Sequence, residues 1–473
     1  MKVTLINPPL NIQIRKRRIS SVINNLFFNS PPLGLCYLAA VLEKEKIPVK
    51  IIDAAVENLG LPEIINRVRE FDTDIVGITS TTTAFFNAVE LAKNIKKDSP
   101  DVPIILGGPH VTASPQHAFS FDCFDMGVLR EGEITLPMLL KALNDKGDLR
   151  GVDGIVFRED SGLFYAKPRE YIKELDVLPF PARHLVPLKL YTPQPNDERA
   201  LPKLSMITSR GCPYGCIFCD KNVFEKSYRS FSADYIVSEM EYLVKNFGAE
   251  DIAFVDSLFA ISEKRVEDIV GQIQKRRIKV SWTCTVRANT MTKKLLKKMK
   301  DSGCWRIRLG IESGNDEVLK FIKKDIATEQ VKNVANWAHE IGLQPKGFFM
   351  IGHLVDTKKT IEDSIKLAKS LPLKDITVQI NTPLPNTLQY SVYKQYGFLT
   401  KQDYSNFTFW QPIFVPESLK ESELIKLHRK FYRSFYLRPV IFWRHLCRIR
   451  SLRDLKKYIK VINLLLHLFF GKA

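Results

Sequence analysis

The chain has 473 residues, 45% of them hydrophobic, which is enough for two or three globular cores because domains typically have about 100 to 200 residues. Its formal net charge is +18, but residues 420–473 carry 14 Lys or Arg against 3 Asp or Glu and so supply +11 of that charge. Such charge suits phosphates, anionic lipids or acidic proteins alike, so it does not by itself identify a nucleic-acid-binding protein.

The chain begins with MKVTLINPPL, the pattern of a short strand and a turn rather than of a charged segment followed by an apolar run. We therefore expect no secretory signal and a cytoplasmic protein. A second basic group follows at Arg15, Lys16, Arg17 and Arg18. Only three of the eight cysteines cluster, and in a reducing compartment this favours metal binding over a disulfide framework.

Residues 1–145 alternate short β-branched runs with helical patterns, which is typical of a parallel sheet wrapped by helices. The predicted strands are residues 2–7, 49–54, 75–80, 103–108 and 124–129. Five strands joined in this way predict a doubly wound α/β domain of flavodoxin-like type, which binds ligands beyond the carboxyl ends of its strands. The residues at those ends are Asn7, Pro8, Ser80, Thr81, Gly107, Gly108, Pro109 and His110.

Residues 146–200 are expected to connect two domains. The segment DGIVFREDSGLFYAKPRE has the pattern of a β-hairpin that turns at Asp160-Ser161-Gly162. The segments LPFPARHLVP and YTPQPNDERALP are rich in proline, so they are not expected to be helical.

Three cysteines form the most specific motif of the chain. In LSMITSRGCPYGCIFCD, residues 204–209 are expected to form a strand, and Cys212, Cys216 and Cys219 lie in the loop after it. Three thiolates can hold three irons of a four-iron cluster and leave the fourth iron open to another ligand. A structural zinc site would need a fourth ligand, and no other Cys or His lies nearby. A disulfide is disfavoured by the odd number of thiols.

Residues 201–390 repeat the order strand then helix. After the strand that precedes the cysteines come the runs DIAFVD, VSWTCTV, RIRLGIES, KGFFMIG and DITVQINTP, with helices expected near 232–246, 262–276, 292–301, 328–341 and 358–370. Six such units predict a partial (β/α)6 barrel with its active site at the carboxyl ends of the strands.

The cysteine motif and these units resemble the radical S-adenosylmethionine (SAM) enzymes. The first domain resembles the cobalamin-binding domains that precede some of their barrels, notably in PPLGLCYLAAVL, LGGPHVTASP and VLREGEITL. Enzymes similar to the anaerobic magnesium-protoporphyrin monomethyl ester cyclase and to hopanoid- or lipid-modifying radical SAM proteins share this arrangement. The resemblance covers nearly the whole chain and implies a 4Fe-4S cluster, SAM on its open iron, and cobalamin in the first domain.

The same resemblance implies which residues contact SAM. They are Phe218, Asp256, Arg287, Glu312, Ser313, Ile351 and Gly352. Asp256 would hold the amino group, the next three would meet the ribose or carboxylate, and the last two would lie against the adenine. A buried carboxylate needs a cationic or donor partner, so Asp256 or Glu312 could instead pair with a structural arginine such as Arg287, Arg306 or Arg308.

For cobalamin, the resemblance implies contacts at the strand ends of the first domain named above and at Glu131 and Glu133. The Gly107-Gly108 turn would let the backbone approach the nucleotide tail of the cofactor. No Asp-x-His-x-x-Gly occurs, so cobalt would lack a protein histidine, a variation that this family also shows. The alternative is a domain that has lost cobalamin and serves as a scaffold.

Two turns differ from the family pattern. Gly352-His353-Leu354-Val355-Asp356-Thr357 stands in place of Gly-x-Pro-Gly-Glu-Thr, and Pro385-Asn386-Thr387 stands in place of Pro-Gly-Thr. Asn accepts the left-handed conformation better than most residues, so the second change is expected to be mild. The first change leaves the shape of that loop open.

Residues 391–473 resemble the basic, helical C-terminal extension of the family, with its FYLRP and Arg-Ser-Leu patterns. On the last predicted helix, one face carries Arg453, Lys456, Lys457, Lys460, Asn463 and His467. Apolar residues fill the other face, and their run at 461–470 is too short to span a bilayer. The helix is expected either to pack on the barrel or to dock on an anionic lipid surface.

The activity that the resemblance implies is radical chemistry on an unactivated carbon. A 5′-deoxyadenosyl radical would take a hydrogen atom from a hydrophobic or natural-product-like substrate, and methylcobalamin would supply a methyl group. Its partners would be this small-molecule or lipid-like substrate, an electron donor of the flavodoxin or ferredoxin type, and a membrane surface for a peripheral contact of the tail.

Three alternatives stay open. One is an oxidative cyclase of the anaerobic tetrapyrrole type, and another is a cobalamin- or redox-sensing protein without catalysis. The third is an RNA methylthiotransferase, but those enzymes carry a second three-cysteine cluster, which Cys36 and Cys123 cannot make, and end in a β-rich module where this tail reads as helical. A nucleic-acid partner is therefore not expected.

Overall fold

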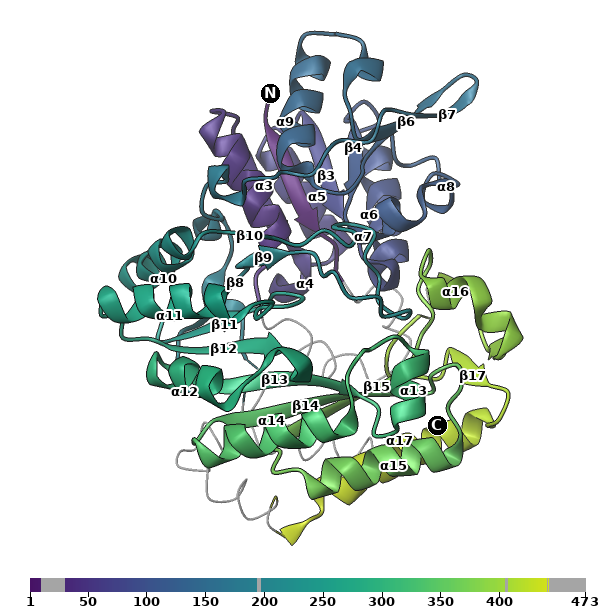
Figure 1. The fold of residues 1–473 in the computed structure, drawn as a ribbon. Helices are drawn as coiled ribbons and strands as arrows, with labels where there is room; N and C mark the ends of the chain where they lie inside the picture. Colours follow the sequence, from purple (N-terminus) through teal and green to yellow (C-terminus); the bar gives the residue numbers. More distant parts are fainter. Residues whose placement is uncertain (10–29, 194–196, 405–406, 440, 442–473) are drawn as a thin grey trace. The chain divides into compact units, whose positions relative to one another are not determined.

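The structure is a computed structural model that describes residues 1–9, 30–193, 197–404, 407–439 and 441 (Figure 1). The chain divides into two compact units. The first contains Met1–Pro193, Asp220–Arg229 and Asp403–Phe407, and the second contains Gln194–Cys219, Ser230–Gln402 and Thr408–Ala473. The chain therefore returns to the first unit twice, the first time directly after Cys219.

The first unit is built on one sheet with the strand order β2-β1-β3-β4-β5-β6-β7. Its parallel strands are β1 (Val3–Asn7), β2 (Val49–Asp53), β3 (Ile75–Thr79), β4 (Ile104–Gly107) and β5 (Met126–Val128). The order 2-1-3-4-5 is that of the flavodoxin-type sheet. The predicted fold of this part and its five predicted strands are confirmed.

Helices cover both faces of this sheet (Figure 1). They are α3 (Leu33–Lys44), α4 (Ala54–Glu57), α5 (Leu61–Glu70), α6 (Phe85–Asp98), α7 (Pro109–Ala113), α8 (Pro115–Ala118) and α9 (Gly132–Asn144), with 3-10 turns η1 (Thr82–Ala84), η2 (Leu149–Gly151), η3 (Leu175–Val177), η4 (Arg183–Leu185) and η5 (Leu188–Leu190). Successive strand residues serve opposite faces: Ile51 packs in the core with Leu139, and Ile52 packs in the core with Phe85. This alternation is the reason why the strands read as continuous apolar runs.

The hairpin predicted inside the connector is present as β6 (Ile155–Glu159) and β7 (Gly162–Tyr165). It does more than connect, because β6 pairs antiparallel with β5, with Val156 opposite Gly127. An uncovered edge strand invites pairing with other chains, and the hairpin occupies the outer edge of β5. The hairpin is therefore part of the sheet of the first unit.

The second unit holds a parallel sheet with the order β15-β14-β13-β12-β11-β8. Its strands are β8 (Lys203–Met206), β11 (Asp251–Phe254), β12 (Ser281–Val286), β13 (Cys304–Glu312), β14 (Gln344–Ile351) and β15 (Asp375–Ile380). The helices between them are α10 (Ala233–Phe247), α11 (Glu263–Lys275), α12 (Lys293–Asp301), α13 (Asp316–Phe321), α14 (Thr328–Glu340) and α15 (Lys358–Ser370). The predicted partial barrel of six strand-helix units is confirmed.

Helix α13 and two very short strands were not expected. Six residues are too few to show a helical period, but Asn315 caps α13 by accepting from the backbone N–H groups of Glu317 and Val318. The two-residue strands are β9 (Ser209–Arg210) and β10 (Arg229–Ser230).

The C-terminal part contains α16 (Leu388–Val392), η7 (Tyr393–Gln395), the antiparallel pair β16 (Gly397–Leu399) and β17 (Phe414–Pro416), and the long helix α17 (Glu421–Tyr436). Helix α17 lies beside α15 (Figure 1), where Lys430 pairs with Glu362 at 2.7 Å. The backbone N–H of Val378 in edge strand β15 donates to the Tyr432 hydroxyl at 2.9 Å. The helical prediction for the tail holds for α17, which packs on the barrel, whereas the β16-β17 pair was not predicted.

Two basic features predicted from the sequence lie outside the described residues. They are the group Arg15 to Arg18 and the helix face that carries Arg453, Lys456, Lys457, Lys460, Asn463 and His467. Among the described helices, none combines the length and the apolar character needed to cross a bilayer.

Candidate active site

Polar residues stand at the carboxyl end of each of the six strands of the parallel sheet in the second unit. They are Thr208 and Ser209 after β8, Asp256 after β11, Arg287 after β12, Glu312 at the end of β13, His353 after β14, and Asn381 after β15. Because all six strands are parallel, these ends lie along one edge of the sheet. The cysteine loop also leaves this edge, directly after Ser209 and Arg210.

Asp256 ties the start of the cysteine loop to the neighbouring strand. It is 4% exposed and accepts hydrogen bonds from the backbone N–H of Thr208 at 2.6 Å and from the Ser209 hydroxyl at 3.0 Å. Burial raises the pKa of Asp256, while the Arg265 guanidinium and these hydrogen bonds oppose that rise. The cation that faces this carboxylate is Arg265, which was not among the arginines weighed from the sequence.

The cysteine loop is held at both of its ends. Gly211, at φ +83°, makes the turn from the strand, and Asp256 fixes the residues before it. Beyond Cys216, the backbone N–H of Ile217 donates to the Ile322 carbonyl at 3.1 Å, and the Ile217 carbonyl accepts from Gln389 at 3.1 Å. A loop pinned in this way keeps the cysteines at the edge of the sheet.

The three cysteines fit the predicted cluster. Cys212 and Cys216 are half-buried and Cys219 is exposed, all within one eight-residue loop. In the part of the chain that the structure describes, no three His, Cys, Asp or Glu side chains converge on the position of a single metal ion. In a four-iron cluster each thiolate binds a different iron, so its ligands need not converge on one point.

Arg287 faces the cysteine loop. Its guanidinium lies 3.5 Å from the centre of the Tyr214 ring, and its Nη1 donates to the Cys216 thiol sulfur at 3.7 Å. The Nη2 group donates to the Lys324 carbonyl. Arg287 is 6% exposed, so this cation is both buried and close to a thiol of the cluster motif.

Glu312 pairs with Lys324 at 2.7 Å, and both side chains are largely buried. The arginines weighed as partners lie elsewhere: Arg306 and Arg308 reach Asp197 at 3.5 and 3.0 Å. Glu312 itself has φ +64°, a left-handed conformation that is uncommon outside glycine. The pairing of Glu312 with Lys324 could not be predicted from the sequence, because Lys324 follows a short helix and belongs to no recognisable motif.

Ser313 is buried, and its hydroxyl contacts other residues of the same unit. Its hydroxyl lies 3.4 Å from the Ser364 hydroxyl and accepts from the backbone N–H of Asn315 at 3.2 Å. These contacts fix the turn into α13. The proposed contact of Ser313 with SAM therefore has to share this hydroxyl.

Strand β14 ends in a turn that carries a buried histidine. Ile351 is buried, Gly352 has φ +78°, and the Gly352 carbonyl accepts from Asn381 at 3.1 Å. His353 is fully buried, its ring centre is 5.8 Å from that of Phe218, and neither ring nitrogen has a hydrogen-bond partner among the described residues. Burial lowers the pKa of His353 to about 3.

Asp356 gives this turn its shape. It accepts from the backbone N–H of His353 at 2.9 Å and from the Thr360 hydroxyl at 2.7 Å. Burial raises the pKa of Asp356 to about 6. In the second altered turn, Asn386 adopts φ +59°, the left-handed conformation expected for it.

In the first unit, the ends of β1 and β2 are joined by a buried polar group. The Asn7 amide donates to Asp53 at 2.8 Å, and the Tyr191 hydroxyl donates to the other Asp53 oxygen at 2.6 Å. Burial raises the pKa of Asp53, and the Tyr191 and Asn7 hydrogen bonds oppose it. Pro8 is buried beside this group, so Asn7 is already engaged by the chain.

The two glycines at the end of β4 have different surroundings. Gly108 has φ +94°, and a Cβ there would come within 2.8 Å of the Thr79 hydroxyl and 2.9 Å of the Ser80 carbonyl. A Cβ on Gly107 would meet nothing within 4 Å. Gly108 is therefore required by its own chain, whereas the open side of Gly107 leaves room for a ligand, which fits a cobalamin contact. Ser80 is buried and Thr81 is exposed next to this turn.

His110, in the first turn of α7 after Pro109, is tied to its own unit. Its Nδ1 lies 3.2 Å from the Thr82 hydroxyl and its Nε2 lies 3.1 Å from His117. It is fully buried, and burial lowers its pKa to about 3. The ring of Tyr404, from the second returning segment, lies 4.7 Å from that of His117.

Glu131 is buried in an ion pair with the first returning segment. It accepts from Arg229 at 2.8 Å and from the backbone N–H of Ile172 at 3.1 Å. The Arg229 guanidinium also lies over the Tyr171 ring at 4.7 Å. Segment 220–229 is thus anchored by a carboxylate that sequence reasoning placed at cobalamin.

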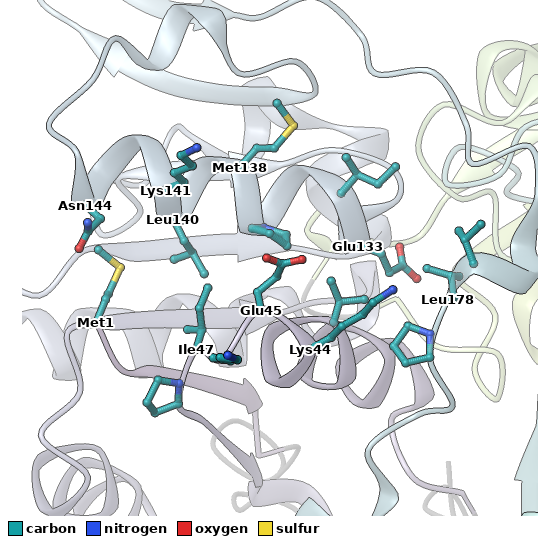
Figure 2. Close-up of a pocket in the computed structure, with 17 residues that line it drawn as sticks. Met1, Lys44, Glu45, Ile47, Glu133, Met138, Leu140, Lys141, Asn144 and Leu178 are labelled. Atoms are coloured by element: carbon teal, nitrogen blue, oxygen red, sulfur yellow. The ribbon is translucent and has the colours of Figure 1, made fainter.

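Glu133 lines a hollow of about 660 Å3 between α3 and α9 (Figure 2). Its walls combine apolar side chains such as Met138 and Leu178 with charged ones such as Lys44 and Lys141. The other residues predicted to contact cobalamin do not line it.

Sequence reasoning missed several residues of this edge. They are Thr208, Arg265, Lys324, His353, Asn381 and Gln389. His353 directly follows a predicted strand, and Asn381 lies near the end of another, DITVQINTP, so both positions carried a usable signal. The others are brought in by helices and loops whose packing the sequence pattern does not show.

Comparison with known proteins agrees with this architecture. The family model described as "Radical SAM superfamily" matches residues 206–368, and that described as "B12 binding domain" matches residues 19–140. A protein of Pyrococcus horikoshii, named uncharacterized methyltransferase PH0819, is 34% identical over 443 residues, which cover 93% of this chain and 94% of that protein.

Two further proteins show how widely the similarity extends. The anaerobic magnesium-protoporphyrin IX monomethyl ester cyclase of Rubrivivax gelatinosus is 27% identical over 420 residues, 86% of this chain and 74% of that protein. The solved structure of the cobalamin-dependent SAM radical enzyme OxsB, with aqua-cobalamin and SAM bound, superposes with a TM-score of 0.74 at 19% identity and covers 99% of this chain and 72% of that one. The latter similarity is one of fold.

Proposed function

Because this chain belongs to the cobalamin-binding radical SAM enzymes, we propose that it is a methyltransferase that acts on an unactivated carbon of a hydrophobic or natural-product-like substrate. The observation that carries the proposal is the cysteine loop pinned at the carboxyl edge of a parallel half-barrel. The relative that matches nearly the whole chain is named a methyltransferase, which supports methylation over other radical chemistry.

When bound, the cluster, SAM and cobalamin supply the electron, the radical and the methyl carrier. The residues of the chain hold and orient these groups. Cys212, Cys216 and Cys219 would hold the cluster, and the open side of Gly107 would admit cobalamin at the first unit. Asp256 keeps the cysteine loop in place from the neighbouring strand.

The SAM contacts stay a proposal for Phe218, Asp256, Arg287, Glu312, Ser313, Ile351 and Gly352. Phe218 is favoured among them, because it stands next to Cys219. Gly352 is packed against its own chain, since a Cβ there would come within 3.1 Å of the Leu424 side chain. Asp256 and Glu312 keep hydrogen-bond capacity, since a carboxylate has about four lone-pair sites.

Methyl transfer is tested with labelled SAM. The protein is reconstituted without oxygen with iron, sulfide and cobalamin, reduced, and given lipid, tetrapyrrole and peptide substrates. We expect 5′-deoxyadenosine, S-adenosylhomocysteine and one product that carries the labelled methyl group. The variant C123A, which changes a buried cysteine outside the loop, should behave as the wild type. A product without the label would refute methylation.

An oxidative cyclase is the second candidate, because the Rubrivivax protein that matches most of this chain is named a cyclase. It would form 5′-deoxyadenosine and a product that has lost hydrogen but gained no methyl group. The mass of the product and the label together distinguish the two reactions.

We further propose two partners. The cluster needs an external reductant, for which a flavodoxin- or ferredoxin-type protein is suited, and the basic tail would contact an anionic lipid surface. Truncation at about residue 450 should weaken binding to anionic liposomes. Unchanged binding would exclude this role of the tail.

A further inference from the structure

Arg287 is a buried cation whose guanidinium is fixed on three sides. Nε donates to Asn289 at 3.3 Å, Nη2 donates to the Lys324 carbonyl, and Nη1 points to the sulfur of Cys216. An arginine stays charged at any pH a protein survives. A permanent positive charge is thus held at a defined place beside one cysteine of the loop.

The Tyr214 ring holds the guanidinium from a fourth direction. The ring lies between Cys212 and Cys216 in the chain, and the guanidinium carbon is 3.5 Å from its centre. A cation over an aromatic face is attracted by the ring quadrupole, and more strongly when it is shielded from water. Arg287 therefore contacts the loop at two points, a ring and a thiol.

The position of this charge has an electrochemical consequence. Reduction of an iron–sulfur cluster adds one negative charge, part of which resides on the thiolate sulfurs. A nearby cation and an N–H···S hydrogen bond stabilise the reduced form more than the oxidised form, and hydrogen bonds to sulfur are a known determinant of cluster potentials. At low dielectric the effect is stronger than in water.

We propose that Arg287 is a positioning residue that raises the reduction potential of the cluster by donating to the Cys216 thiolate from its place on Tyr214. The enzyme would then accept an electron more readily from a flavodoxin- or ferredoxin-type donor. This inference rests on the cluster of the proposed function, but not on which product is formed.

The test is a redox titration followed by electron paramagnetic resonance, with full-length protein that holds four irons per chain. R287Q removes the charge and should lower the midpoint potential, by roughly a tenfold change in the reduction equilibrium constant, or about 59 mV for one electron. R287K keeps a charge but loses the planar fork, so its potential should lie between those of R287Q and the wild type. Y214L leaves Arg287 unchanged, and its potential should also fall, by less than in R287Q.

R438Q is the matched control. Arg438 is a half-buried arginine of the same unit that lies over the Phe435 ring at 4.4 Å and donates to the Lys369 carbonyl, and it belongs to no part of the candidate site. Its loss should leave the potential at the wild-type value.

Three results would overturn the inference. One is a wild-type potential in R287Q combined with weaker SAM binding, which would make Arg287 a SAM contact instead. Another is an equal shift in R438Q, which would indicate a general effect of lost charge. The third is a potential of R287K below that of R287Q. If the variants show the expected order of midpoint potentials but the wild type transfers no methyl group, that result would count against the proposed function and not against this inference.

Discussion

The two units each place a buried histidine shortly after a positive-φ glycine at the carboxyl end of a parallel strand. His110 follows Gly108 after β4, and His353 follows Gly352 after β14. Both side chains are fully buried, and burial lowers the pKa of each to about 3. By position and burial the two are equivalent.

Their hydrogen bonds differ. Thr82 and His117 satisfy both nitrogens of His110, whereas His353 finds no partner among the described residues. A buried polar group without a partner costs about 1–3 kcal/mol. At the strand edge of the first unit, the buried histidine therefore obtains its hydrogen bonds from its own unit. At the strand edge of the second unit, His353 has no hydrogen-bond partner among the described residues and lies next to the cysteine loop.

The largest effect is expected from replacing the three cysteines, which should remove the reaction at the strand edge of the second unit and leave cobalamin binding by the first unit intact. The triple variant C212A/C216A/C219A should abolish reductive cleavage of SAM, because no thiolate remains to hold iron. Cobalamin uptake should stay within about twofold of the wild type, because the first unit contains none of the three residues. Formation of 5′-deoxyadenosine and absorbance of bound cobalamin measure the two outcomes. Residual cleavage in the variant would contradict the assignment of the cluster.

Removal of the satisfied histidine should be costly. H110L leaves the buried Thr82 and the half-buried His117 without their partner, so we expect a loss of up to about 3 kcal/mol in the free energy of unfolding. Urea denaturation, followed by the fluorescence of the chain, measures it. The control H184L removes an exposed histidine from a surface pair with Glu43 and should cost less than about 1 kcal/mol. Similar losses in both variants would show that the bonds of His110 contribute little.

The paired glycines of the first unit provide an intermediate effect. G108A places a Cβ at φ +94° against Thr79 and Ser80, and should cost about 1–3 kcal/mol. G107A meets no atom and should leave stability unchanged while it weakens cobalamin binding. Thermal unfolding and cobalamin titration of the two variants give the readouts. A G107A protein with wild-type cobalamin affinity would remove this residue from the candidate site.

The smallest effect, with the opposite sign, is expected at His353. H353L removes a buried group that forms no hydrogen bond with any described residue, so at pH 7.5 the free energy of unfolding of the apoprotein should rise by about 1 kcal/mol. His353 has a folded-state pKa of about 3 against an ordinary value of 6.5, so below pH 6.5 the unfolded state binds the extra proton. The wild type should therefore lose stability as the pH falls, and the advantage of H353L should grow by up to about 1.4 kcal/mol per pH unit down to about pH 4.5. Melting temperatures at several pH values test both signs. A less stable H353L would mean that His353 has a partner after all.

Local patterns in the sequence were sufficient for the two sheets and the cysteine loop. Strands β1 to β5 are apolar runs bounded by turn residues. The Cys-x3-Cys-x2-Cys spacing supplies three thiolates in one loop, which is one ligand too few for a structural zinc site and matches a four-iron cluster with an open iron. The cysteines and the strand ends were therefore found directly.

Long-range partners could not be read in this way. The sequence does not show that β6 pairs with β5, that Lys324 neutralises Glu312, or that Arg287 contacts the thiol of Cys216 in the loop. Each depends on packing between segments that are far apart in the chain. Helix α13 was missed for another reason, because six residues do not establish a period.

The return of residues 220–229 to the first unit limits how this protein can be cut into modules. A fragment that ends at Pro193 would lack Arg229 and leave Glu131 buried without its cation, at a cost of about 3–5 kcal/mol. Transplanting the cobalamin-binding half into another enzyme therefore requires a discontinuous graft, in which this ten-residue piece and Asp403–Phe407 travel with the N-terminal 193 residues. Since the ten-residue piece begins directly after Cys219, the boundary of the graft is covalently bound to the last thiol of the cluster motif.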